Sequence, residues 1–532
     1  MTPREGLYER VLAAGGGALP APRPARASAA VALWRRRAGE LEVFWLRRGR
    51  TLPFMGGWHA FPGGAIDRGD ALLPALGGPA HPDPEARTPA SPDPGAPLAD
   101  ADLAPGIAAG ALRELFEETG LLIARGASAL ADGRWRSRWR ERLRAGGGGL
   151  DAGLAEAGAA LDTGRLVFAG RWLTPPFTPL RFDNRFFLLA WRPEDGEPSV
   201  APPESEEGEW LAPERALARI GEGTAMAAPP IVHLLRVLAE AGPEAGLGRL
   251  LDTREANLGP LRRIELRPAI LVFPLAAATL PPASHTNAFL VGGGEALLID
   301  PGSPFAAEND KLLAALDAAR ATLGRRPIAI LLSHHHPDHV AGAAYVAART
   351  DLPIWAHAAT AERVAALGLA VARRLEGGET IRLAGEPATT LLVHHTPGHA
   401  RGHLALEVVE RGDLLSGDLV AGVGTIVIDP PEGDMDDYLD SLERMRARRP
   451  RTLFPSHGAA ILDADAKLVE YLRHRLAREE QVLASWRAGA RAPAAMVAEV
   501  YPDLAPAARP LAERQIVAHL ERLARRGRLA ET

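Results

Sequence analysis

The chain has 532 residues, which exceeds what one hydrophobic core accommodates and predicts three domains. Its 47% hydrophobic and 24% charged residues exclude extensive disorder, and its net charge of −5 excludes a global attraction to polyanions. Because there is no cysteine, disulfides, thiolate nucleophiles and cysteine-ligated zinc are excluded, and histidine and carboxylates remain as strong metal ligands. No run approaches the roughly 20 apolar residues of a membrane span, so we expect a cytoplasmic protein without membrane contact.

The first half of the chain is organised around a predicted hairpin. Residues 1–27 are rich in Ala, Pro and Gly and predict a flexible tail, and two strand-like runs follow, AAVALWRRR and LEVFWLRRG. They open a domain that we place at residues 28–242. Within it, residues 71–108 are dominated by Pro, Ala, Asp and Gly and predict an inserted surface loop. A stretch rich in Gly and charge, residues 243–266, is interpreted as a linker.

The second half changes character twice. From about Ile270, short β-rich runs alternate with helical ones such as residues 306–323, which is typical of a mixed α/β domain over residues 267–460. Residues 461–532 have helical periodicity and arginine-rich faces, and they predict a small helical domain. The fold class expected for the whole chain is therefore multidomain α/β.

Three carboxylates occupy one face of a predicted helix in the first half. The run RELFEETG places Glu114, Glu117 and Glu118 at positions i, i+3 and i+4. Like charges so close repel, and oxygen ligands for a hard cation such as Mg²⁺ explain them simply. A solvated acidic helix is the alternative. Glu204, Glu206 or Glu207, further along, is a candidate for another ligand or a base.

This segment resembles the second half of a Nudix box, and FPGGAID (residues 61–67) resembles the first half, with Asp70 where the family usually has glutamate. Between Asp70 and Arg113 lie 42 residues instead of the usual seven, so 35 are extra. The split box, FMGGWHAFPGG and RWLTPPFTPLRFDNRFFLLA resemble the mammalian Nudix type 19 family of coenzyme A diphosphatases. The resemblance implies an α/β/α sandwich that binds Mg²⁺ or Mn²⁺ through Glu114, Glu117 and Glu118, with Glu114 and Glu118 catalytic and with supporting or substrate-contacting roles for Gly64, Asp70 and Arg113.

A run of histidines follows a predicted strand in the second half. The strand PIAILLS leads into His334, and the alternation of extended chain directs His334 and His336 to one side. Pro337 ends the extended run, so Asp338 and His339 begin a helix. A single histidine is usually a structural residue, but four candidate ligands within six residues predict a metal site that holds two cations.

The run resembles the metallo-β-lactamase superfamily, and the resemblance continues in TPGH (residues 396–399), LSGD (415–418) and FPSHG (454–458). It implies an αββα sandwich with two Zn²⁺, or other transition metals, that lower the pKa of a bridging water and present hydroxide as the nucleophile. The implied roles are one metal on His334, His336 and His399, the other on Asp338, His339 and His457, Asp418 between them, Asp338 catalytic and Asp300 orienting a ligand histidine. His403 adds another imidazole near this site, and its role is open.

Further runs, including GVGTIVIDP and YLDSLERM, resemble the β-lactamase-like protein 2 family, whose members end in a winged-helix domain and include single-strand endoribonucleases. RNA phosphodiesters and thioesters are both open as substrates. Residues 471–532 hold 11 Arg against 7 acidic residues, so single-stranded RNA is a candidate partner through arginines such as Arg522, Arg525, Arg526 and Arg528. A solvated helix face or a homodimer contact explains the same excess.

These patterns predict a bifunctional hydrolase. The first domain would hydrolyse a small diphosphate such as coenzyme A or a nucleoside diphosphate derivative, and the second an ester-type bond. The alternative is that only the second domain is catalytic and the first is a ligand-binding or regulatory module.

Overall fold

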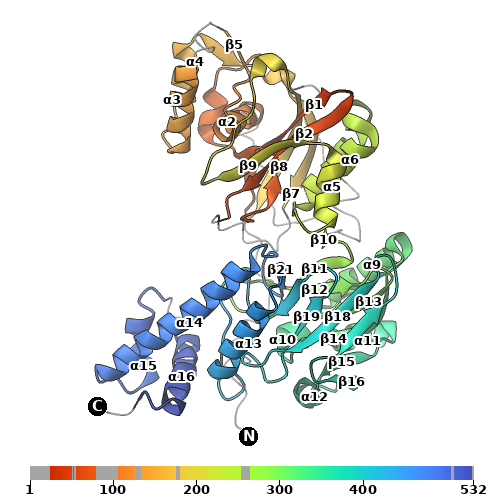
Figure 1. Cartoon of the computed structure of the whole chain (residues 1–532), viewed down its shortest axis with the longest axis vertical. Helices are drawn as coiled ribbons and strands as arrows, with labels where there is room; N and C mark the ends of the chain where they lie inside the picture. Colours follow the sequence, from red (N-terminus) through yellow and green to blue (C-terminus); the bar gives the residue numbers. More distant parts are fainter. Residues whose placement is uncertain are drawn as a thin grey trace. The chain divides into compact units, whose positions relative to one another are not determined.

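The computed structural model describes residues 24–50, 52, 55–79, 106–126, 133–174, 180–252, 264–504 and 508–529. The chain divides at Arg267 and Pro268 into two compact units, the first within Ala21–Arg267 and the second within Pro268–Thr532. Figure 1 shows the elements of each. Among the described helices, none is both long and apolar enough to traverse a lipid bilayer.

The first unit is built on one sheet. β1 (Arg26–Arg37) and β2 (Glu40–Arg48) form the predicted hairpin, and Ala38 and Gly39 in its turn have φ angles of 51° and 88°, as two-residue hairpin turns require. The strand order is β3-β2-β1-β8-β7, with β4 paired to β1 and β9 paired to β2. The additional strands are β3 (His59–Ala60), β4 (Gly63–Ala65), β7 (Val167–Leu173), β8 (Phe182–Ala190) and β9 (Ser205–Leu211).

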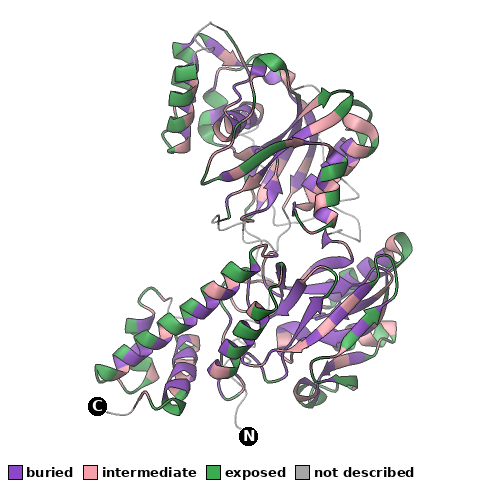
Figure 2. Cartoon of the chain, viewed as in Figure 1, coloured by how far each residue is buried: buried purple, intermediate pink, exposed green. Residues whose placement is uncertain are grey.

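Helices cover both faces of this sheet. Because side chains alternate along a strand, Val31 and Leu33 of β1 face α2 (Ile107–Thr119), and Ala32 faces α6 (Pro229–Ala245). Figure 2 shows the buried sheet between these layers. The other elements are η1 (Arg68–Leu72), β5 (Ala124–Gly126), α3 (Gly133–Arg144), α4 (Leu150–Glu156), β6 (Ala159–Leu161), η5 (Thr163–Arg165), η6 (Pro193–Asp195), α5 (Pro213–Gly221), α7 (Leu247–Leu251) and β10 (Glu265–Arg267).

Two sequence predictions differ from this structure. Part of the expected linker 243–266 is helical. The backbone is kinked at Gly242, where φ is 74° and ψ is 178°, but a further helical turn extends to Ala245 and α7 follows, with Leu250 fully buried in the core shared with α6. The expected loop 71–108 is also shorter at both ends, since η1 includes its first two residues and α2 begins at Ile107. Residues 80–105 of that loop lie outside the described residues.

The second unit contains two sheets, with strand orders β11-β12-β13-β14-β15-β16 and β17-β18-β19-β20-β21. Helices α9 and α12 pack on the first sheet, α11 packs against α9, and α13 packs on the second sheet (Figure 1). The predicted helix 306–323 is confirmed as α9. The bounds are β11 (Ile270–Ala276), β12 (His285–Val291), β13 (Glu295–Ile299), α9 (Ala306–Leu323), β14 (Arg326–Leu332), α10 (Pro337–Val340), α11 (Ala343–Thr350), β15 (Ile354–His357), α12 (Ala358–Ala365), β16 (Val371–Leu375), β17 (Thr380–Leu383), β18 (Thr389–His395), β19 (Leu404–Val408), β20 (Asp413–Gly417), α13 (Met435–Ala447) and β21 (Thr452–Pro455).

A helical tail completes the second unit. It comprises α14 (Ala464–Arg487), α15 (Pro493–Val500) and α16 (Arg509–Arg525). The first part of α14 buries Leu468 and Leu472 in the core that also contains α13, whereas its last part buries Val482 and Leu483 with α15 and α16. Because α14 belongs to both cores, the tail is continuous with the α/β part.

Candidate functional site

The histidine run lies at the end of β14, as the sequence predicts. His334 and His336 follow the strand, and Asp338 and His339 lie on the short helix α10, which begins with Pro337 at its first position. The backbone here is closely packed, since a Cβ atom on Gly302 would lie 1.7 Å from the carbonyl oxygen of Asp338. Only glycine allows that approach.

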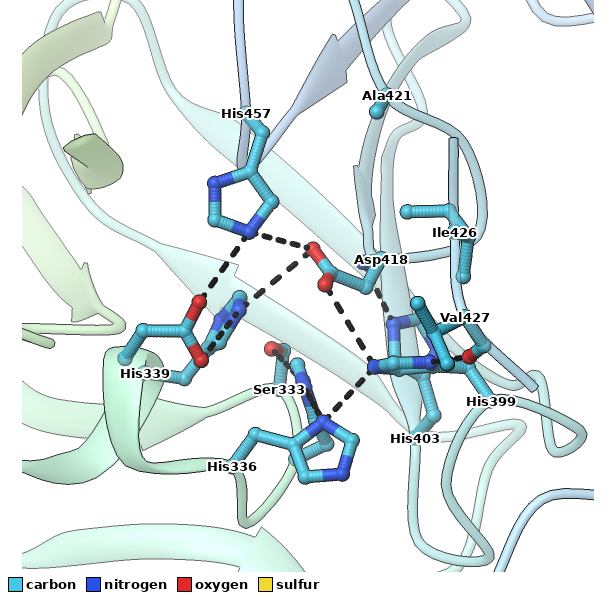
Figure 3. A network of polar contacts seen from close by, with 12 residues as sticks. Ser333, His336, His339, His399, His403, Asp418, Ala421, Ile426, Val427 and His457 are labelled. Atoms are coloured by element: carbon cyan, nitrogen blue, oxygen red, sulfur yellow. Dashed lines mark hydrogen bonds and ion pairs between the residues drawn. The ribbon is translucent and has the colours of Figure 1, made fainter. Parts of the chain in front are cut away.

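The other ligands come from loops that follow strands of the second sheet. His399 follows β18, Asp418 follows β20 and His457 follows β21. All seven candidate ligands are buried, and the structure brings them together in one cluster (Figure 3).

Three imidazoles form the first group of the cluster. Nδ1 of His336 lies 3.0 Å from Nε2 of His334 and 2.8 Å from Nε2 of His399. A second group contains Asp338, His339 and His457, with Nε2 of His457 3.5 Å from Oδ2 of Asp338. Within each group the ligand atoms lie within 4.8 Å of one another.

Asp418 lies between these groups. Its Oδ2 is 3.5 Å from Nε2 of His399, and its Oδ1 is 3.5 Å from Nε2 of His339 and 3.4 Å from Nε2 of His457. One oxygen therefore faces each group, which is the arrangement expected of a bridging carboxylate.

The electrostatics of the cluster fit bound cations. Burial lowers the pKa of His334 and His336 well below the usual value, so both are neutral, as metal ligands must be. Burial opposes ionisation of Asp418, but His457 and His339 hold its pKa well below the ordinary range. Among the described residues, Nε2 of His339 and Oδ1 of Asp418 are buried without a hydrogen-bond partner. Since an unsatisfied buried polar atom is costly, a cation between these atoms would stabilise the cluster.

In three of the candidate ligand histidines, the ring nitrogen that faces away from the cluster lies beside a carboxylate or a backbone carbonyl oxygen. Nδ1 of His339 lies 2.9 Å from Oδ2 of Asp300, Nδ1 of His399 lies 2.6 Å from the carbonyl oxygen of Val427, and Nδ1 of His457 lies 3.1 Å from that of His285. Such contacts fix the tautomer that directs the opposite nitrogen to a metal. The structure thus places Asp300 where the sequence assigned it.

His403 takes a part that the sequence left open. Its Nε2 accepts a hydrogen bond from the backbone N–H of Asp418 at 2.9 Å, and its Nδ1 lies 2.8 Å from the Thr396 hydroxyl. Burial lowers its pKa to about 3, so it is neutral. His403 therefore positions the backbone of a candidate ligand and belongs to neither of the two ligand groups. Spacing alone could not have revealed this contact.

The first unit contains a second cluster, on α2. Oε2 of Glu118 accepts a hydrogen bond from the backbone N–H of Gly63 at 2.9 Å, which connects the two halves of the split motif. Gly64 makes room for Glu114, since a Cβ atom there would lie 2.6 Å from its carboxylate. Nη1 of Arg113 lies 2.9 Å from Glu114 and 3.3 Å from Glu117.

The long insertion leaves Asp70 in contact with this cluster. Its carboxylate accepts hydrogen bonds from Nε and Nη2 of Arg113, at 2.6 and 3.0 Å, and the residue is 2% exposed. A Cβ atom on Gly110 would lie 2.7 Å from Oδ2 of Asp70, so glycine is needed at this helix position. Asp70 holds Arg113, which in turn holds two of the three glutamates.

Burial strongly affects the three glutamates. It raises the pKa of Glu114 to about 7 and that of Glu118 to about 8, where the charge of Glu114 adds to the effect, and it also raises the pKa of Glu117. Glu204 contributes to the shifts of Glu117 and Glu118. Such a cluster is stabilised when a divalent cation replaces the protons.

Two features near the acidic cluster could not be predicted from the sequence. Glu206 and Glu207 are ion-paired with Arg47, at 3.0 and 2.6 Å, whereas the charge of Glu204 raises the pKa of Glu118. Arg48 was not singled out by the sequence. Its charge lowers the pKa of Glu118, and its Nε is buried without a hydrogen-bond partner among the described residues.

The substitution Asp300→Asn tests whether Asp300 orients His339. Both Ser333 and His339 donate to Asp300, so an asparagine amide group would have to face one of these donors. Asparagine tolerates the φ of 49° at this position, and the fold should persist. We expect the affinity for Zn²⁺, measured by chelator competition, to fall about 10–100-fold. The exposed Asp310→Asn is the control, and unchanged affinity in Asp300→Asn would refute the assigned role.

The pH dependence of stability tests the acidic cluster. Because the pKa of Glu118 rises from 4.5 to about 8 on folding, the folded chain retains a proton that the unfolded chain releases between these values. Stability in Mg²⁺-free buffer should therefore decrease as pH rises through this window. We expect the thermal midpoint of the wild type to fall relative to Glu118→Gln between pH 5 and 8. Parallel profiles of the two proteins would contradict a buried ionising Glu118.

Both the α/β part and the helical tail of the second unit match known protein families. The sequence model of the Metallo-beta-lactamase superfamily matches residues 281–457, and that of the Beta-lactamase associated winged helix domain matches residues 492–532. The tail is thus confirmed as similar to a winged helix domain. A crystal structure of a NUDIX hydrolase from Alicyclobacillus acidocaldarius is 32% identical, covering 41% of this chain and 93% of that chain with a TM-score of 0.34. The diphosphatase interpretation depends on the side chains described above.

Curated relatives match the second unit. Beta-lactamase-like protein 2 homologs are 29% identical in Caenorhabditis elegans and 30% in Drosophila melanogaster, each covering 37% of this chain and respectively 64% and 67% of the relative. An atrochrysone carboxyl ACP thioesterase from Paecilomyces divaricatus is 28% identical over 44% of this chain and 69% of its own length. The matches thus span about two thirds of these relatives. Through its second unit, the chain belongs to the metallo-beta-lactamase superfamily of hydrolases.

Proposed function

We propose that the second unit hydrolyses thioesters with two transition-metal ions, Zn²⁺ being the first candidate. The observation that carries the proposal is the position of Asp418, with one oxygen facing each of two buried ligand groups. The similarity to a protein named as an ACP thioesterase supports this substrate class.

The residues of the site divide into two sets. His334, His336 and His399 would hold one ion, Asp338, His339 and His457 the other, and Asp418 would contact both. Two ions so held would lower the pKa of a water molecule and would polarise the acyl carbonyl group. The ligand donors are oriented beforehand by their outer contacts, which reduces the reorganisation needed during the reaction.

The reaction consumes one water and yields a carboxylic acid and a thiol. Attack on the carbonyl carbon releases a proton from the water, and cleavage of the carbon–sulfur bond requires a proton for the departing sulfur. We infer that Asp338, whose buried carboxylate lies 3.5 Å from Nε2 of His457, would hold that proton and pass it on.

The tail favours a thioester over RNA. Arg522 and Arg526 pair with Asp436, each at 2.9 Å, and Arg525 pairs with Asp434 at 2.6 Å. Arg528 pairs with Glu480 at 3.0 Å. These ion pairs neutralise the basic residues that the sequence offered as phosphate contacts, so the second unit gains little attraction to a polyanion from them.

Parallel assays test the substrate class. We expect the zinc-loaded protein to hydrolyse acetyl-coenzyme A and an acyl-pantetheine, and Asp418→Asn to reduce the rate at least roughly 100-fold, because a bridging ligand matters more than the outer contacts of a ligand. Glu118→Gln, in the other unit, should leave thioester hydrolysis unchanged. Cleavage of single-stranded RNA or a lactone without thioester turnover would contradict the proposal.

For the first unit, we propose a second activity, the hydrolysis of a small diphosphate with Mg²⁺ or Mn²⁺. Three buried glutamates with raised pKa values favour it, because they provide oxygen ligands for a hard cation at one place. The resemblance to coenzyme A diphosphatases supports coenzyme A or a nucleoside diphosphate derivative as the substrate. A bound divalent ion neutralises a diphosphate and positions it for attack by water.

The chain's own residues supply the rest of this site. Arg113 and Asp70 hold the glutamates in place, while Glu204 is the candidate base. Nε of Arg48, which has no acceptor among the described residues, is the candidate donor to a phosphate oxygen. A guanidinium group binds phosphate well because its planar donors match two oxygens.

Two substitutions separate catalysis from binding in the first unit. We expect Glu118→Gln to abolish coenzyme A or ADP-ribose hydrolysis, and Arg48→Gln to raise KM about tenfold with a smaller change in kcat. Asp418→Asn should retain diphosphate hydrolysis. Equal rates for Glu118→Gln and wild type would refute catalysis and favour the alternative of a ligand-binding or regulatory module.

A further inference from the structure

The loop between β20 and α13, residues 418–434, contacts a candidate metal ligand directly. The carbonyl oxygen of Val427 lies 2.6 Å from Nδ1 of His399, and Figure 3 shows this carbonyl beside the imidazole, with Ile426 adjacent. The orientation of His399 thus depends on where the loop places this peptide group.

The preceding peptide group is held by the helical tail. The carbonyl oxygen of Ile426 accepts hydrogen bonds from Nη2 of Arg475, on α14, and from Nε2 of Gln515, on α16, the latter at 3.1 Å. Nη2 of Arg475 also lies 3.3 Å from the Thr425 hydroxyl, and its Nη1 lies 3.4 Å from Oε1 of Gln515. Two helices of the tail therefore converge on one carbonyl oxygen.

Further contacts fix the same loop to the tail. Arg514 pairs with Asp429, and the Tyr471 hydroxyl accepts a hydrogen bond from the backbone N–H of Ala421 at 3.0 Å. The loop is thus attached to the tail before and after Val427.

Arg475 is a buried charge without an ion pair among the described residues. It is 1% exposed, its hydrogen-bond partners are all neutral, and its Nε has no hydrogen-bond partner, although its guanidinium group lies 5.3 Å from the centroid of the Tyr438 ring. Desolvating a guanidinium group is costly, so such an arrangement is better explained by the geometry that it specifies than by stability. That geometry is the path of residues 425–427.

We propose that the tail is a positioning element of the metal centre: Arg475 and Gln515 hold the Ile426 carbonyl so that the adjacent Val427 carbonyl fixes His399. The inference rests on the proposed function only in that the ligand cluster binds metal. Arg475 and Gln515 are positioning residues, because they act through the loop and lie outside the ligand cluster. The winged helix-like tail would thus have a role that needs no nucleic acid.

The experiment measures metal binding to the full chain, with Zn²⁺ by chelator competition and with Co²⁺ by the visible absorption of the bound ion. We expect Arg475→Gln and Gln515→Leu each to weaken the binding of one of two ions about 10–100-fold and to alter the Co²⁺ spectrum. Arg475→Lys, which restores one donor, should recover part of the affinity.

Val482→Ala is the matched control. Val482 is buried in the core that α14 shares with α15 and α16, and it is not one of the residues described above as holding the loop. This substitution should lower the thermal midpoint while leaving metal affinity and the Co²⁺ spectrum unchanged. Wild-type affinity for both ions in Arg475→Gln and Gln515→Leu would overturn the inference. Absence of metal binding by the wild type would overturn it together with the proposed function, whereas metal binding without thioesterase activity would refute only the latter.

Discussion

The central constraint in the second unit is the burial of seven polar and ionisable side chains at one point. Nδ1 of His336 lies 2.8 Å from Nε2 of His399, and histidine nitrogens lie 3.4–3.9 Å from the carboxylate oxygens of Asp338 and Asp418. Nε2 of His339 and Oδ1 of Asp418 have no hydrogen-bond partner among the described residues. Such a cluster is unfavourable without cations and favourable with them. The surrounding fold serves this arrangement: strand ends deliver the ligands, and backbone carbonyl groups and Asp300 orient them.

The acidic cluster of the first unit follows the same principle with different ligands. Carboxylates alone favour a hard cation, whereas imidazoles with carboxylates favour a transition metal. Burial that raises the pKa of Glu118 to about 8 leaves that site dependent on either protons or a divalent ion. The chain thus combines two candidate sites with different ligand types, carboxylates in the first unit and imidazoles with carboxylates in the second.

The local sequence was sufficient to predict the candidate ligands, but it could not predict the long-range contacts that hold them in place. His334 to His339 were predictable because strand alternation and a proline determine their directions within six residues. The contact of His399 with Val427 spans 28 residues, and that of His457 with His285 spans 172, so both depend on loop paths that no local pattern encodes.

The tail arginines show what a local pattern leaves out. Their excess made single-stranded RNA a candidate partner, which stays a prediction, and no local pattern indicated that Asp434 and Asp436 at the start of α13 pair with arginines some 86–91 residues later. Asp70 is the converse case, because its contact with Arg113 persists across the long insertion. The acidic residue type at position 70 indicated a role in this site, whereas its distance along the sequence from Arg113 did not.

The central claim is that the histidine and aspartate cluster holds two metal ions, and elemental analysis of the purified full-length protein tests it most directly. After equilibration with Zn²⁺ and removal of loosely bound ions, the account predicts about two transition-metal ions per chain in the wild type, and a loss from that number when His336 or Asp338 is replaced by alanine. A wild-type protein without tightly bound transition metal under these conditions would contradict the account.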